Sequence, residues 1–83
     1  MVSGGDTTGS GFSVTPAGNS FTINFDPGLF TLNEAIVVNV TPIGTANVTS
    51  IVTSPDSGSG ASAIIVFDSG PDGFSFVATQ VLS

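Results

Sequence analysis

The sequence predicts an all-β protein, a small antiparallel β-sandwich, from two observations. Short runs of β-branched and aromatic residues alternate with polar residues, and Gly, Pro, Asn and Asp interrupt them at intervals of about 8 to 12 residues, a spacing typical of sandwiches and barrels. No segment shows the apolar repeat of an amphipathic helix. The closest candidate, residues 29–35, follows Pro27 and Gly28, which favours an irregular loop.

Six strands are expected. They cover residues 11–15, 20–26, 35–41, 46–54, 61–68 and 74–82, and the segments between them carry the residues that turns prefer. In the second strand, Phe21, Ile23 and Phe25 share one face, while polar residues such as Thr22 and Asn24 fill the other. This pattern indicates a strand that covers a core on one side and meets solvent on the other.

The third, fifth and sixth expected strands are apolar on both faces. In residues 35–41, three aliphatic residues fill one face, and the other holds Ala35 and Val37 with Asn39 as the only polar residue. Monomeric sandwiches rarely expose large apolar patches, so a second buried surface between subunits is expected. The alternative is that these residues lie on an ordinary surface, where single apolar side chains are common. The contact residues expected from this pattern are Val37, Ile64 and Val66.

The first ten residues differ from the rest of the chain. After the first two positions they consist of Gly, Ser and Thr with one Asp, a composition typical of flexible linkers. We therefore expect an arm over residues 1–10 and a sandwich domain over residues 11–83. The arm is expected to connect neighbouring units, by adding a strand to a free sheet edge. Its expected connector residues are Val2, Ser3, Asp6, Thr7 and Thr8.

Composition narrows the possible partners. The 83 residues include no Lys, Arg, His, Cys, Trp or Tyr, and the formal net charge is -6. A core of this size is marginal by itself, and with disulfides excluded, oligomerisation is the expected source of stability. A polyanion is repelled by phosphate backbones and by anionic lipids, so neither nucleic acid nor membrane partners are expected. Association of like-charged copies favours placing the carboxylates in outer loops.

The same composition excludes most catalysis. Ser–His and Cys–His nucleophile pairs and zinc sites built from His or Cys are impossible, so we expect no enzyme and no cofactor. A pair of carboxylates could still serve as acid and base in glycoside cleavage, although most candidates occupy ordinary turn positions for Asp. Calcium is the remaining possible metal, because residues 68–72 place two carboxylates in one loop. The acidic candidates are Asp26, Glu34, Asp56, Asp68 and Asp72.

The order of the motifs GSGFSVTP, NSFTINFDPGLF, AIVVNVTP, ANVTSIVTS and DGFSFVATQ resembles a C-terminal module of bacterial and phage surface proteins. Such modules are similar to the small trimeric jelly-roll heads of the tumour-necrosis-factor and complement type. The resemblance covers about residues 11–80 and implies a jelly-roll-like trimer. It also implies that Phe74, Phe76 and Ala78 pack along the threefold axis as part of the assembly interface, while Ile36, Val38 and Val40 line the sandwich. No collagen-like Gly-X-Y repeat precedes the domain, which favours a subunit that polymerises directly.

Together these features predict a structural subunit of an extracellular fibre or appendage on a cell, spore or virion surface, with a homotrimer as its unit and copies of itself as its partner. The alternative is a receptor- or glycan-binding tip that uses the loops at residues 26–33, 55–60 and 68–73. Loss of glycan binding on loop substitution would favour this alternative. A hydrolase that uses the acidic residues is a third hypothesis.

Overall fold

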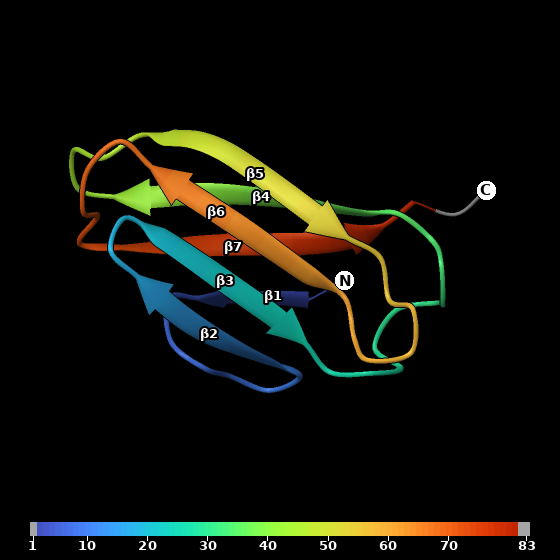
Figure 1. Ribbon diagram of the computed structural model, residues 1–83. Helices are drawn as coiled ribbons and strands as arrows, with labels where there is room; N and C mark the ends of the chain where they lie inside the picture. Colours follow the sequence, from blue (N-terminus) through green and yellow to red (C-terminus); the bar gives the residue numbers. More distant parts are fainter. Residues whose placement is uncertain (1, 82–83) are drawn as a thin grey trace.

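The computed structural model describes residues 2–81, which form two antiparallel sheets packed face to face as a sandwich (Figure 1). One sheet has the strand order β1-β7-β4, and the other has the order β2-β3-β6-β5. The strands are β1 (Val2–Gly5), β2 (Phe12–Ala17), β3 (Ser20–Phe25), β4 (Ile36–Ile43), β5 (Val48–Ser54), β6 (Ser62–Phe67) and β7 (Gly73–Gln80). The predicted all-β sandwich is therefore confirmed.

The pairing of the strands is nested. The first strand pairs with the last, and β3 pairs with β6, in both cases antiparallel. The chain crosses between the sheets on passing from β1 to β2, from β3 to β4, from β4 to β5 and from β6 to β7. Strands that follow one another in the chain also pair, β2 with β3 and β5 with β6, so both sheets of the sandwich are antiparallel throughout.

Each of the six expected strands is present, with its described ends shifted by at most two residues. Residue 82 of the last expected strand lies outside the described residues. The seventh strand, β1, was not expected. Val2–Gly5 pair with β7 from Val2↔Ala78 to Gly5↔Ser75, so the prediction of a flexible arm is wrong for these residues. The edge of β7 supplies backbone partners to a segment whose glycines give no strand signal of their own.

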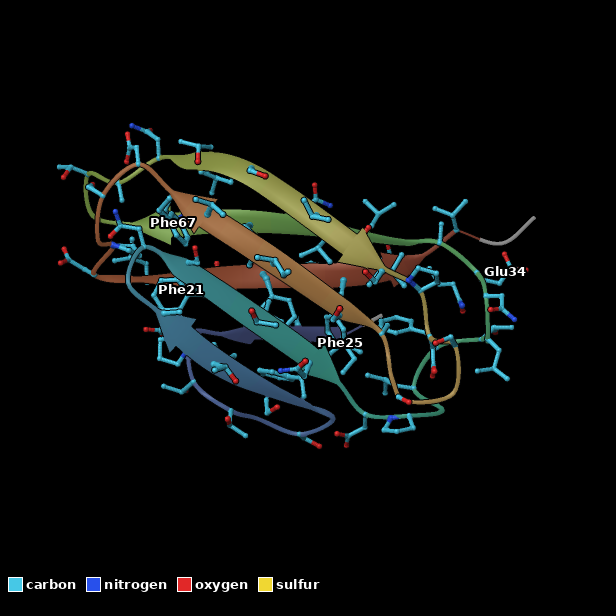
Figure 2. All side chains as sticks on the ribbon, viewed as in Figure 1. Phe21, Phe25, Glu34 and Phe67 are labelled. Carbon is cyan, nitrogen blue, oxygen red and sulfur yellow. The ribbon has the colours of Figure 1, made fainter. Side chains whose placement is uncertain are left out.

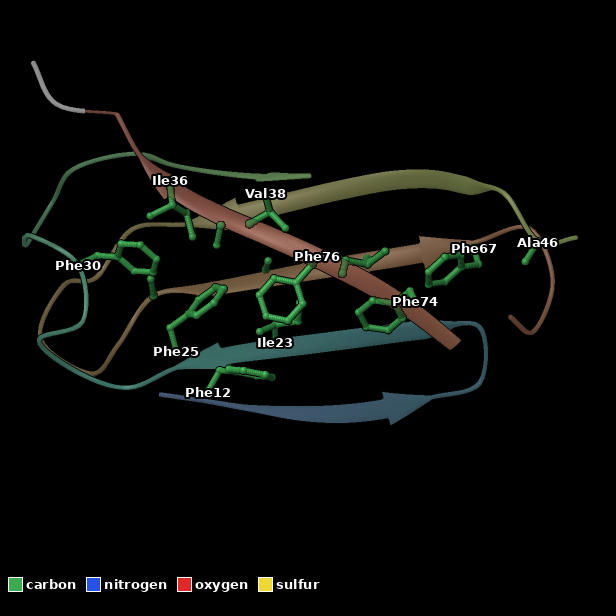
Figure 3. Packing of buried hydrophobic residues seen from close by; sticks show 14 residues of the cluster. Phe12, Ile23, Phe25, Phe30, Ile36, Val38, Ala46, Phe67, Phe74 and Phe76 are labelled. Carbon is green, nitrogen blue, oxygen red and sulfur yellow. The ribbon is translucent and has the colours of Figure 1, made fainter. Parts of the chain in front are cut away.

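A single core fills the space between the sheets, and aromatic rings dominate it (Figure 3). Phe12 meets Phe76 of the opposite sheet edge to face, with ring centroids 5.0 Å apart, and Phe25 meets Phe30 in the same way at 5.2 Å. Edge-to-face pairs add about 0.5–1.5 kcal/mol each beyond the burial of their area. Since the chain has no disulfide or salt-bridging cation, this packing and the β-ladders hold the fold together.

Apart from residues 6–11, which run beside β2, the connections between strands lie at the two ends of the sandwich (Figure 1). Residues 26–35 and 55–61 form one end, which we call the Asp56 end. Residues 18–19, 44–47 and 68–72 form the opposite end, which we call the Asp68 end. The principal extents of the molecule are 35 × 22 × 18 Å, so the two ends are its most widely separated regions.

Candidate functional site

All six acidic residues lie in connections at the two ends, and neither sheet has an ionisable side chain on its outer face. Figure 2 shows Glu34 at the tip of the Asp56 end, far from Phe67 beside the Asp68 end. The expectation that the carboxylates occupy outer loops is confirmed. The Asp56 end holds Asp26, Glu34 and Asp56, and the Asp68 end holds Asp68, Asp72 and, from the connection after β1, Asp6.

The outer face of the four-stranded sheet consists of three cross-strand rows of neutral residues. The rows are Ser13-Asn24-Ser62-Ser54, Thr15-Thr22-Ile64-Val52 and Ala17-Ser20-Val66-Ser50. Val52 is 56% exposed and Ile64 is 42% exposed, and these two lie opposite each other on neighbouring strands. With the half-buried Val66 they form a continuous apolar surface, which we call the β5–β6 patch.

The outer face of the three-stranded sheet is also neutral. Its central row is Ser3-Val77-Asn39, across β1, β7 and β4. Val77 is 37% exposed and has Val37, 42% exposed, as its diagonal neighbour on β4. Ile43, 55% exposed, lies farther along the same face, and Asn39 and Thr41 of β4 separate it from Val37.

The predicted interface residues do not form one surface. Val37 lies on the outer face of the three-stranded sheet, whereas Ile64 and Val66 lie on the opposite side of the molecule. Phe74, Phe76 and Ala78 lie in the core and are at most 2% exposed, so the expectation that they contact another subunit is wrong for this fold. Alternation in β7 shows two apolar faces but does not say which one faces the opposite sheet.

Val52, which lies opposite Ile64 on the outer face, is not among the contact residues predicted from the sequence. Residues 46–54 were expected as a strand, but a β-bulge between Val48 and Ser50 reverses the alternation of side chains. Val48 packs against the core, while Val52 faces outward. A strict alternation of inward and outward side chains, as expected for residues 46–54, does not predict such a bulge.

The expected connector residues take different places. Val2 packs against the core and Ser3 belongs to an outer face, so both are part of the sandwich. Asp6, Thr7 and Thr8 are exposed in the connection to β2, where Thr8 Oγ1 accepts a hydrogen bond from the Val14 N–H at 3.3 Å.

The Asp56 end is organised by a single buried carboxylate. Asp56 Oδ1 accepts hydrogen bonds from the backbone N–H groups of Gly58 at 2.8 Å and Gly60 at 3.0 Å, and Oδ2 accepts one from Gly28 at 3.1 Å. These bonds, from Gly58 foremost and then Gly28, lower the pKa of Asp56 against the opposing effect of desolvation. Its backbone oxygen also accepts from the Asn33 N–H at 2.8 Å, so Asp56 joins the two connections of this end.

Gly60 makes this arrangement possible. Its φ is +102°, in the region that favours glycine, and a Cβ at this position would overlap the carbonyl oxygen of Phe25. The chain therefore needs glycine here to bring the connection after β5 close to the end of β3.

The Asp68 end has a comparable but exposed contact. Asp68 accepts hydrogen bonds from the Asn47 N–H at 2.9 Å, from Asn47 Nδ2 at 3.2 Å and from Ser69 Oγ at 3.3 Å. The bonds from the Asn47 backbone and then from its side chain lower the pKa of Asp68. Among residues 2–81, no three acidic side chains converge in an arrangement that could hold a metal.

The remaining functional candidates are divided between the ends. Asp68 and Asp72 are separated by the length of the sandwich from the other three acidic candidates, and the receptor-binding loop at residues 68–73 is equally far from the loops at 26–33 and 55–60. The part of the chain that the structure describes encloses no pocket.

No protein-family model, curated protein or solved structure matches this chain. The resemblance to surface-fibre modules therefore stays a prediction. Residues 2–81 contain no helix long and apolar enough to cross a membrane. The feature of the molecule that bears on function is the separation of its charged ends from its neutral faces.

Proposed function

We propose that this protein is a structural subunit that associates with copies of itself through the outer faces of its sheets and contributes to an extracellular fibre or appendage. The observation that supports the proposal is the location of charge. Each copy has a net charge of -6, and the sheet faces are the surfaces where two copies can meet without opposing carboxylates.

The β5–β6 patch is the proposed centre of the contact. Full burial of an aliphatic side chain contributes about 1.5–3 kcal/mol, and Val52 and Ile64 begin partly exposed, so each would add only part of this. The surrounding Ser, Thr and Asn rows can form hydrogen bonds across an interface without the desolvation of a charge. A stable contact therefore needs the face as a whole, with the patch at its centre.

Stacking of copies along the long axis is disfavoured by the same distribution. Each end has three carboxylates, so an end-to-end contact brings like charges together. Two unit charges about 4 Å apart near a protein surface repel by about 4 kcal/mol, and salt reduces this value. Side-by-side packing of sandwiches avoids that repulsion.

A homotrimer is the proposed closed unit, as the resemblance implies. A trimer that gathers the β5–β6 patch around its axis leaves the opposite face, with Val37 and Val77, on its outside. A second contact through this face would join trimers, since contacts between two different surfaces can continue into open fibres.

Sedimentation of the purified protein over a concentration series, together with electron microscopy of the same samples, tests this proposal. We expect trimers at low concentration and laterally associated filaments at high concentration. A protein that sediments as a monomer throughout the micromolar range would contradict the proposal.

A further inference from the structure

We infer that β1 is an exchangeable strand, such that Val2–Gly5 of one copy occupies the β1 position beside β7 of a neighbouring copy. The inference rests on the proposed self-association, because exchange requires copies that lie side by side. The binding site is the backbone edge of β7 that β1 covers in this structure, together with the core beneath it, and its ligand is the same strand of a second copy.

Few interactions hold β1 in place. It is an edge strand of four residues that pairs with β7 alone. Val2 is its only apolar side chain, Ser3 faces outward, and the last two residues are glycines. Detaching β1 therefore removes little apolar contact besides the ladder itself, and a segment of this kind belongs to the least stable part of a fold.

The position that β1 leaves, however, has to be refilled. Gly4 lies directly over the ring of Phe12, which in turn contacts Phe76 edge to face in the core. Without β1, the ring of Phe12 would lose this cover, and the backbone groups of β7 on that side would lose their partners. Uncovered aromatic surface and unpaired edge groups both favour capture of another strand.

The same contact determines which strand fits. A Cβ at the position of Gly4 would overlap the Phe12 ring, so the incoming segment needs glycine there. Two residues earlier, the position of Val2 faces the core and prefers an apolar side chain. The chain itself provides this Val-Ser-Gly sequence, which makes β1 of another copy a matching occupant.

The edge of this strand also lacks the protection that the other edges have. β2 contains Pro16, β4 contains Pro42, and β5 has a bulge, and such features limit further pairing of edge strands. β1 has none of these features. Pairing between copies is therefore least hindered at the side of the molecule where β1 lies.

The connection to β2 can act as the hinge. Asp6 to Ser10 are all exposed, and the hydrogen bonds from Gly9 N–H to the Phe12 carbonyl, at 3.2 Å, and from Val14 N–H to Thr8 Oγ1 hold it locally. The seven Cα steps from Gly5 to Phe12 span about 23–25 Å when extended. This reach exceeds the 22 and 18 Å widths of the sandwich but not its 35 Å length. Exchange therefore fits lateral neighbours, in agreement with the charge argument.

Cysteine pairing across β7 tests the inference, because the natural chain contains no cysteine. Ser3 and Asn39 lie directly opposite Val77 on its two sides, on β1 and β4 respectively. Chains with Ser3→Cys and chains with Val77→Cys, distinguished by a mass tag, are mixed in denaturant, refolded together and oxidised. The matched control mixes Asn39→Cys with Val77→Cys, because β4 is not expected to exchange. Sedimentation of each mixture before oxidation reports the oligomeric state.

We expect a disulfide-linked heterodimer of the Ser3→Cys and Val77→Cys chains, several-fold more abundant than in the control mixture. Equal yields in both mixtures would overturn exchange, since they would indicate simple contact between outer faces. Oligomers without the heterodimer would overturn exchange and leave the proposed function standing. Monomers without any cross-link would overturn both.

Discussion

The ends and the outer faces of this sandwich differ in how they use charge. Each end contains three carboxylates. One at each end, Asp56 or Asp68, accepts hydrogen bonds from the connections that it holds together. The outer faces contain only Ser, Thr, Asn, Ala, Gly and aliphatic residues.

Turn preferences explain part of this difference, because Asp is common in turns and rare in strands. They do not explain why the faces also lack the Lys and Glu that usually protect exposed sheets and edges. A surface without such protection is suited to contact with another copy. The charged ends thus contain residues that stabilise the fold, and the neutral faces are the surfaces that we propose for assembly.

A substitution in the core should have the largest effect on the stability of the fold. Phe76→Ala should destabilise the fold by about 3–5 kcal/mol, because it removes a buried ring that packs against Phe12 and Phe25. Urea denaturation followed by circular dichroism measures this loss. A variant that keeps its stability but fails to assemble would instead place Phe76 at an interface, against its burial in the structure.

The two organising aspartates should differ in their importance. Asp56→Asn should lower the urea midpoint clearly, because the buried carboxylate accepts three backbone N–H groups that an amide satisfies less well. Asp68→Asn should have a smaller effect, because Asp68 is exposed and water can replace the lost acceptor. Equal shifts of the two midpoints would show that burial at the Asp56 end does not strengthen its contacts.

A change of pH should have a smaller effect on the stability of the fold. The folded-state pKa values of Asp56 and Asp68 lie below their ordinary value of 3.8, so their stabilisation is present above that value. It is lost as the pH falls through the lower folded-state pKa values. Urea midpoints measured from neutral pH to below pH 3.8 should decline at the acidic end, and Asp56→Asn should reduce the decline. A midpoint that rises on acidification would contradict the assignment.

Much of the fold could be predicted from the sequence, because side-chain alternation in segments such as Phe21 to Phe25 reports strands directly. Three features could not. β1 forms because its backbone pairs with the edge of β7. The bulge after Val48 changes which side chains of β5 face outward. The hydrogen bond from the Gly28 N–H to Asp56 joins residues far apart in the chain.

The proposed contact surface differs from the set of residues predicted from the sequence for a related reason. A strand with two apolar faces does not reveal which face lies inside, so Phe76 and Ile64 were assigned to the same interface. The structure places Phe76 in the core and Ile64 on the β5–β6 patch. Only the arrangement of the two sheets distinguishes them.

The central claim is that the neutral faces, and not the charged ends, carry self-association. Sedimentation of two variants with the same added charge tests it most directly. Ile64→Asp places the charge on the β5–β6 patch, and Ser59→Asp places it in an exposed connection of the Asp56 end. Ile64→Thr is the neutral control for the loss of the apolar side chain. We predict that Ile64→Asp remains folded but monomeric, that Ile64→Thr associates more weakly than the natural chain, and that Ser59→Asp associates normally. Normal association of Ile64→Asp, or its loss in Ser59→Asp alone, would contradict the claim.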